Sequence, residues 1–192
     1  MKIKITLFTL ALGGSLLGAL AAPSSVTAET TATAQVAEQA QREQIMHLLS
    51  AIHELPKKPA FLSITDDAHL HLIEIVEDEA LLPQLRYRAL EALGSYWPSP
   101  AVRDLYIKAI EQTQHEPLRH RAMMMGAPRF GDDLVPTLAK LLDGDLQLSL
   151  TAIEALSIID STSSRRALQR AKEAATQPLI KKRIDAALTR VR

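Results

Sequence analysis

The feature that most constrains this chain is a nine-residue pattern that recurs four times, with starts 33, 30 and 31 residues apart. The first copy runs from Leu85 to Leu93, and later copies begin at Leu118, Leu148 and Leu179. In the first three copies, apolar or small residues occupy the first, fifth, sixth, eighth and ninth positions, which share one helix face. Because the same face returns at a nearly fixed interval, the sequence predicts stacked helical units of similar build.

Each of these helices is expected to be followed by a second helix. Proline lies just ahead of the repeated pattern at Pro83, Pro117 and Pro178, where its fixed φ suits a first helical turn. The second helices show their own apolar stripe, which recurs after 33 residues. Its two copies are Val102, Leu105, Tyr106 and Ala109, then Val135, Leu138, Ala139 and Leu142.

An opening pair of helices is predicted upstream, over Ile45–Leu49 and Ala68–Val76, separated by a longer loop at residues 56–61. Asp132-Asp133 and residues 161–164, all Ser or Thr, precede second helices and are predicted to cap them. The last copy of the pattern has Arg183 where the first has an alanine, as expected for a terminal unit without an outer neighbour. The chain is therefore predicted to be all-α, with about four helix pairs over residues 36–192.

Two stretches bear a family resemblance. "LRYRALEALGSYWPSPAVRDLYIKAI" and "EPLRHRAMMMGAPRFGDDLVPTLAKLLDGD" resemble HEAT-like repeats of the short kind known from phycobilisome lyases. The resemblance covers nearly all of the chain after its leader. It implies an α-solenoid, a right-handed superhelical stack whose second helices line a curved, protein-binding face. Some members are bilin lyases and others are accessory modules, so the resemblance says little about function.

The N-terminal segment has the pattern of an export signal. Lys2 and Lys4 precede an apolar stretch over residues 5–20, and small residues then offer cleavage sites after Ala28 or Ala21. Retention as a membrane anchor is the alternative. Residues 1–28 are thus predicted to be a signal peptide and residues 29–35 a flexible lead-in. A periplasmic or secreted location follows, with no stable membrane span after cleavage, and this location makes a pigment-lyase role unexpected.

Composition excludes several classes of function. The 192 residues include no cysteine, which rules out disulfides, thiolate metal sites and a cysteine nucleophile. The formal net charge of zero argues against a generally basic nucleic-acid binder. No two of the six histidines have the i, i+4 spacing that puts both on one helix face, so no metal site is predicted. No catalytic residue and no cofactor are predicted either.

Several conspicuous residues have structural interpretations. Met123 and Met125 occupy core positions of the repeated pattern, and Tyr96-Trp97 is expected to cover the end of the first-helix layer. Two pairs of arginines recur at equivalent positions, and we expect them to pair with carboxylates of adjoining repeats such as Asp104 or Glu116. A ladder facing an anionic partner is the alternative. The recurring arginines are Arg86, Arg88, Arg119 and Arg121.

Charge is segregated along the chain. Residues 29–82 contain ten acids and three bases, whereas residues 163–192 contain two acids and nine bases. Because sequence order is spatial order in a solenoid, one end is predicted to be acidic and the other basic. Ordinary solvated faces explain such a pattern, but it also allows head-to-tail self-association through the two ends. The basic residues concerned are Arg165, Arg166, Arg170, Lys172, Lys181, Lys182 and Arg183.

The sequence therefore predicts a non-catalytic, exported module or scaffold that binds another protein through its curved face. Helix phase places candidate contact residues on the second helices: Arg103, Asp104, Lys108, Thr137, Lys140, Gln169 and Arg170. One alternative is an enzyme accessory or lyase relative that holds a small ligand in the groove, which would need a deep apolar pocket with converging polar groups. The other is a self-assembling structural protein.

Overall fold

The computed structural model describes residues 25–51 and 54–190, with side chains from residue 33 onward. Residues Ala37–Arg192 form one compact unit, and Met1–Val36 form another. Over the described ranges every regular element is helical and no strand occurs, so the all-α prediction is confirmed. The elements are α1 (Ser25–Leu49), α2 (Lys58–Leu62), α3 (Ala68–Glu77), α4 (Pro83–Tyr96), α5 (Pro100–Gln112), α6 (Glu116–Phe130), η1 (Gly131–Leu134), α7 (Val135–Lys140), η2 (Leu141–Asp143), α8 (Leu146–Ile159), α9 (Thr162–Ala174) and α10 (Pro178–Leu188).

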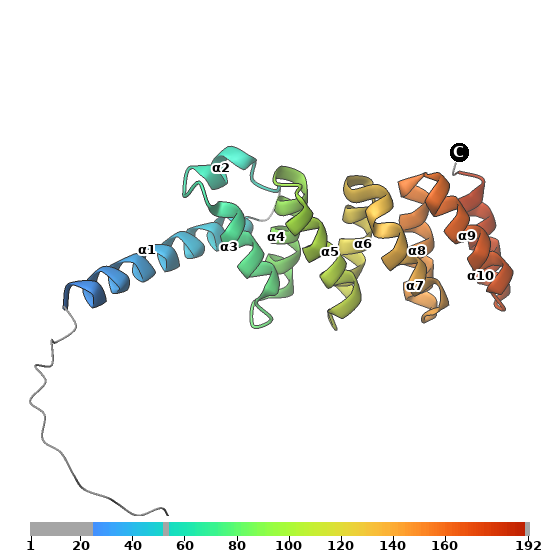
Figure 1. Ribbon diagram of the computed structural model, residues 1–192, viewed down its shortest axis with the longest axis horizontal. Coiled ribbons are helices and arrows are strands. Elements are labelled where there is room, and N and C mark those ends of the chain that lie inside the picture. The colour runs from blue at the N-terminus through green and yellow to red at the C-terminus, as the bar shows by residue number, and fades with distance from the viewer. Residues whose placement is uncertain (1–24, 52–53, 191–192) are drawn as a thin grey trace, which may run out of the picture. The chain divides into compact units, whose positions relative to one another are not determined.

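The four copies of the repeated pattern form α4, α6, α8 and α10. Each of these helices packs against the next one along the chain, so within residues 37–192 they make one continuous layer (Figure 1). The apolar positions face inward as predicted. In α8, for example, Ala152, Ile153, Ala155 and Leu156 are all buried. The small residues at these positions let neighbouring helices approach closely.

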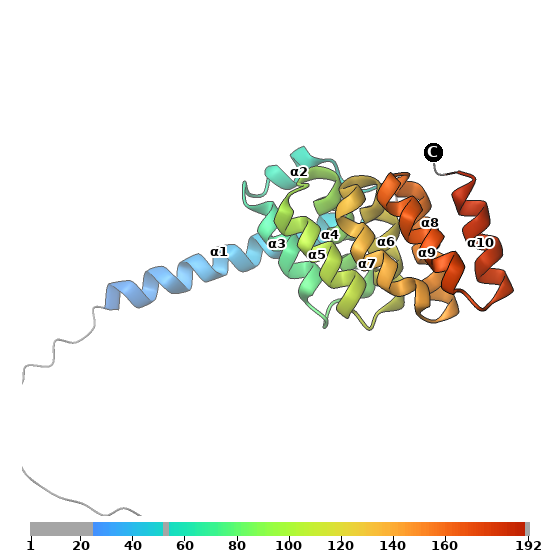
Figure 2. The same ribbon diagram turned by 45° about the vertical axis from the view of Figure 1, so that its right-hand side comes forward.

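The second helices lie beside this layer. Helices α5, α7 and α9 contact one another in chain order, and α5 and α9 also pack on α6 and α8 (Figure 2). Their predicted apolar stripes are buried or half-buried. Helix α7 is the exception in form, because it has only six α-helical residues and a 3₁₀ turn at each end.

Helix ends agree with the sequence at some positions and differ at others. Pro83, Pro117 and Pro178 lie in first turns, and Ser161 begins α9 with a capping box shared with Ser164. The predicted loop at residues 56–61 instead contains helix α2. Asp132-Asp133 lies inside η1 and makes no side-chain cap, so that capping prediction is wrong.

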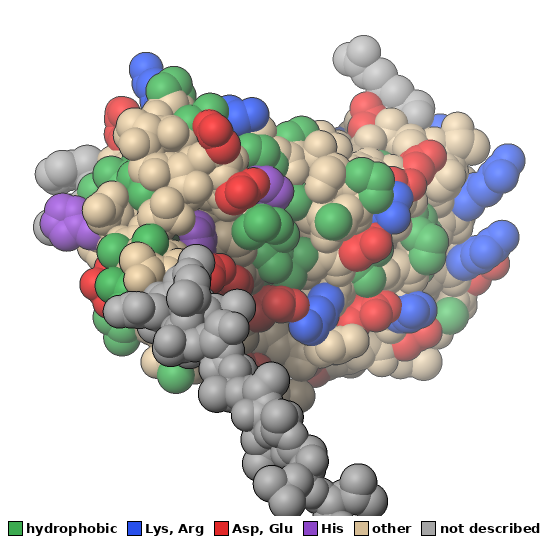
Figure 3. All heavy atoms as spheres, turned by 60° about the vertical axis from the view of Figure 1, so that its left-hand side comes forward, with side chains coloured by type: hydrophobic (Ala, Val, Ile, Leu, Met, Phe, Trp, Pro, Cys, Tyr) green, Lys and Arg blue, Asp and Glu red, His purple; other side chains and the backbone are tan. Residues whose placement is uncertain are grey.

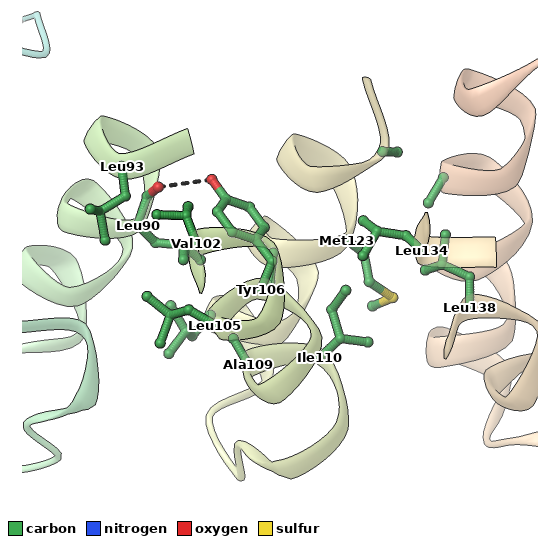
Figure 4. Close-up of a cluster of buried hydrophobic side chains, with 14 of the residues drawn as sticks. Leu90, Leu93, Val102, Leu105, Tyr106, Ala109, Ile110, Met123, Leu134 and Leu138 are labelled. Atoms are coloured by element: carbon green, nitrogen blue, oxygen red, sulfur yellow. Dashed lines mark hydrogen bonds between the residues drawn. The ribbon is translucent and has the colours of Figure 1, made fainter. Parts of the chain in front are cut away.

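The core centres on Tyr106, which two glycines accommodate. The Tyr106 hydroxyl donates a hydrogen bond of 2.8 Å to the Leu90 carbonyl oxygen (Figure 4). A Cβ atom on Gly94 would lie 2.3 Å from this hydroxyl oxygen, and one on Gly126 would lie 2.7 Å from Leu134 Cδ1 and 2.9 Å from the tyrosine ring. Neither approach is sterically allowed, so the buried tyrosine requires glycine at both positions.

An aromatic cluster covers one end of α4. Trp97 makes edge contacts with Phe61 and Tyr96, with ring centroids 6.1 and 6.0 Å apart, and it stacks on His69 at 6.4 Å. The Lys58 ammonium lies 5.1 Å from the indole centroid. The Tyr96-Trp97 pair therefore packs within the protein, as predicted, and α2 supplies part of its cover.

Helix α1 begins before the predicted domain boundary. Ile45 and Leu49 are fully buried, whereas every described side chain from Thr33 to Ala40 is exposed. Residues 29–35, predicted as a flexible lead-in, lie within this helix. The proposed leader lies mostly outside the described residues, and only its last four, 25–28, belong to α1.

Candidate functional site

Three predicted contact residues form ion pairs between successive second helices. Lys108 on α5 lies 2.6 Å from the Glu77 carboxylate on α3. One step further along the stack, Lys140 on α7 lies 2.9 Å from Glu111 on α5. These lysines therefore link adjacent helices while remaining largely exposed, and the links recur at the interval of the repeat.

Arg103 makes a third link on the same face. Its guanidinium lies 2.9 Å from Asp104 on its own helix and 3.2 Å from Asp133 on η1. Hydrogen bonds to Asp104 and then to Asp133 raise the pKa of Arg103 above its ordinary value. Carboxylates therefore already occupy much of the hydrogen-bonding capacity of this arginine.

The remaining predicted residues divide into buried and exposed. Thr137 is only 5% exposed and lies against the core, so its assignment as a contact residue is wrong. Its hydroxyl lies 3.5 Å from the Glu111 carboxylate on α5, so Thr137 is enclosed in the contact between α5 and α7. Asp104, Gln169 and Arg170 are exposed, as expected.

An open groove separates α7 from α9. Its volume is about 570 Å³, and its lining is mostly apolar. The lining residues are Val135, Pro136, Ala139, Leu142, Asp143, Ser163, Arg166, Ala167, Arg170, Ala171 and Ala174. Alanines supply much of the lining, and these short side chains leave the space between the two helices unfilled.

Two arginines of α9 line this groove. Arg166 and Arg170 are exposed and one helical turn apart, and neither forms an ion pair with any described residue. The groove has one carboxylate, Asp143, at its α7 side. The hollow between α3 and α5 is smaller, about 220 Å³, and Lys108 and Glu77 are both in its lining. The α7–α9 groove thus differs from that hollow in size and in its excess of unpaired positive charge.

Charge on the surface follows the segregation seen in the sequence. Acidic and basic side chains alternate over the middle of the face in Figure 3, and Lys and Arg side chains project at the right-hand end, which the last helices form. In α9 and α10, Lys172 pairs with Asp185 at 2.5 Å. The other basic side chains of this end leave it with a positive surplus.

The arginines that recur on the first helices do not pair as predicted. Arg86 donates from Nε to the Val76 carbonyl oxygen at 2.9 Å, and Arg119 donates to the Thr113 carbonyl oxygen. Arg88 donates to the Glu54 carbonyl oxygen at 2.9 Å, while Arg121 lies over the Tyr87 ring at 5.3 Å. They therefore satisfy carbonyl oxygens and cover a ring, instead of binding Asp104 or Glu116.

Other candidate chemistry is sparse. No group of three or more His, Asp or Glu side chains could hold a metal ion in the portion that the structure describes. His71 is buried with its Nδ1 atom 3.5 Å from Glu74, and His115 caps α6. Met123 is buried, as its core position implied. None of the described helices is both long enough and apolar enough to cross a membrane.

Over the described residues, these features define an all-helical protein with a charged second-helix face and an open groove between α7 and α9. No protein-family model matches the chain, and no curated protein matches its sequence. The assignment to HEAT-like repeats therefore remains a prediction from the sequence pattern. The sequence pattern did not predict the groove, although its alanines, such as Ala167 and Ala171, are a signal that could have indicated it.

Proposed function

We propose that this protein is an exported, non-catalytic binding module built as an α-solenoid of about four HEAT-like helix pairs. The observation that supports the proposal most strongly is the second-helix face, where successive helices present exposed polar side chains at the repeat interval. A stack whose helices are linked in this way offers a surface that needs little ordering when a partner binds. The apolar segment that follows Lys2 and Lys4 supports export.

The face is suited to a protein partner. Its exposed residues include Lys108, Lys140, Gln169 and Arg170, spread over three helices instead of converging on one point. Small ligands usually bind in an enclosed pocket with converging polar groups, whereas the α7–α9 groove is open and mostly apolar. An extended segment or a helix of another protein can contact several second helices at once.

The test compares two double variants that break the same ion pairs from opposite sides. Lys108→Ala with Lys140→Ala removes the cations, whereas Glu77→Gln with Glu111→Gln removes their carboxylates and leaves the cations free. Tagged full-length protein and both variants are expressed in the source cells, and retained proteins are quantified after capture. We expect the lysine variant to lose a partner that the glutamine variant retains.

Thermal melts separate binding from folding in this comparison. Exposed ion pairs contribute at most about 1 kcal/mol, so the two double variants should melt within a few degrees of each other. Equal retention of every captured protein by both variants would contradict the assignment of this face. If the unmodified chain retained no protein specifically, that outcome would also contradict the assignment of this face.

A further inference from the structure

The groove between α7 and α9 differs from its neighbours in how its charges are balanced. Between α3 and α5, Lys108 meets Glu77, and between α5 and α7, Lys140 meets Glu111. Arg170 follows Lys108 by two repeats on α9, yet it forms no ion pair with a described residue. Asp143 lies at the position equivalent to Glu77 and Glu111 and lines the groove, but it forms no ion pair with Arg166 or Arg170, and the two arginines outnumber it. A carboxylate from outside the chain can therefore pair with these arginines.

The groove also has an apolar surface. Val135, Ala139 and Leu142 face Ala167 and Ala171 across it, and the space of about 570 Å³ is open to solvent. Arg166 and Arg170, in turn, are neighbours on one helix face. A ligand that fits this groove would therefore have small apolar side chains for the lining and carboxylates beside them for the two arginines. An acidic amphipathic helix has both.

The exposed part of α1 has this composition. Val36 is 71% exposed, and Ala40 follows it one turn later on the same face. Glu43 continues that face, and Glu38 places a second carboxylate on the other side of the same helix. Arg42, the one base among residues 33–43, is already paired with Asp78 at 2.7 Å. Every side chain of residues 33–40 is exposed, so this helical stretch gains little from its own chain and burial against a partner would stabilise it.

We propose that residues 33–43 of a second copy of this chain dock into the α7–α9 groove, with Val36 and Ala40 against its apolar lining and Glu43 facing Arg166 and Arg170. A second copy is the expected occupant because the two ends of the chain have opposite charges. Residues 29–82 have a net charge of −7, and residues 163–192 have a net charge of +7. The contact joins different surfaces of the two copies, so each copy retains a free groove or a free α1 segment. Such a contact builds chains that lengthen with concentration, unless they close into rings.

The proposal is independent of the partner-binding role proposed above. A strictly monomeric protein would overturn self-docking and leave that role intact. Equal partner capture by the lysine and glutamine variants, in a protein that still associates with itself, would overturn that role and leave self-docking intact. The two tests therefore fail separately.

The experiment measures molar mass by size-exclusion chromatography with light scattering, over a range of protein concentrations and at low and high salt. The full-length gene is expressed, and the protein is purified as the cell processes it, with intact mass defining its N-terminus. We expect a mass above that of the monomer at low salt. The apparent dissociation constant should rise about tenfold or more when salt shortens the screening length from about 10 Å to about 3 Å.

Charge-reversal variants locate the contact. Arg166→Glu with Arg170→Glu should make the protein monomeric, whereas Lys181→Glu with Lys182→Glu, an equal charge change on the exposed side of α10, should change the constant less than threefold. Glu38→Lys with Glu43→Lys should also abolish association, and combining it with the groove reversal should restore it. Equal effects of the groove and α10 reversals would overturn the proposal. So would a failure of the combined variant to associate.

Discussion

The close fit of Tyr106 between two glycines gives the sharpest stability prediction, for the substitution Gly94→Ala. In an ordinary helix interior, replacing glycine by alanine stabilises by about 1 kcal/mol. Here the new Cβ would lie 2.3 Å from the Tyr106 hydroxyl oxygen and 2.9 Å from ring atom Cζ. The tyrosine is fully buried, so it can move only by disturbing its neighbours.

The expected net effect follows from three contributions. Overpacking costs about 1–3 kcal/mol, and displacing the hydroxyl from the Leu90 carbonyl oxygen costs about 1 kcal/mol more. Subtracting the helix-propensity gain leaves a destabilisation of about 2 kcal/mol. For a domain of this size, that lowers Tm by about 4–8 °C.

The assay is reversible unfolding in urea and by heat, followed by far-UV circular dichroism. Gln84→Ala, at an exposed position of the same helix, serves as the control and should change stability by less than about 0.5 kcal/mol. In the Tyr106→Phe background, which lacks the clashing oxygen, Gly94→Ala should cost about 1 kcal/mol less. An unchanged or raised Tm for Gly94→Ala alone would refute this account of the core.

Three further predictions concern other contacts. Burial raises the pKa of Tyr106 above its ordinary value of 10.0, so the unfolded chain releases this proton at a lower pH than the folded protein does. The free energy of unfolding, measured in urea at a series of pH values, should therefore fall above about pH 10. The Tyr106→Phe variant should show a smaller fall. Arg86→Ala removes the buried hydrogen-bond donor to the Val76 carbonyl oxygen and should lower the free energy of unfolding by about 2 kcal/mol in the same assay. Arg121→Ala, at an exposed position, should lower it by less than about 1 kcal/mol. Ser161→Ala removes the capping box of α9 and should cost about 1 kcal/mol; a cost near zero would show that the cap contributes nothing.

The sequence predicted the helices because their signals are local. The repeated spacing of apolar residues defines which face of α4, α6 and α8 is buried, and proline and serine mark where helices begin. Helix α2 was missed because Lys57 to Ala60 contains two lysines and a proline, which are typical of a loop. Its formation depends on Phe61, which is fully buried against aromatic residues distant in sequence.

The candidate site was less predictable because it depends on side chains from different repeats. Helix phase correctly placed Lys108 and Lys140 at the surface, but only the structure shows which carboxylates they meet. Thr137 was misplaced because its burial depends on the neighbouring helix α5, whose Glu111 carboxylate lies 3.5 Å from the Thr137 hydroxyl. The arginines that bind carbonyl oxygens, such as Arg86, also escaped prediction, since a backbone acceptor leaves no trace in residue type.

The most direct test of the central claim, a protein-binding second-helix face, is photo-cross-linking in living cells with a reactive amino acid placed at single exposed positions. Gln169 and Lys140 represent the second helices, and His120 and Glu154 represent the first-helix layer. We predict that the two second-helix positions yield the same cross-linked protein and that the two first-helix positions yield little. Equal yields from both layers, or yields confined to the first-helix layer, would contradict the account.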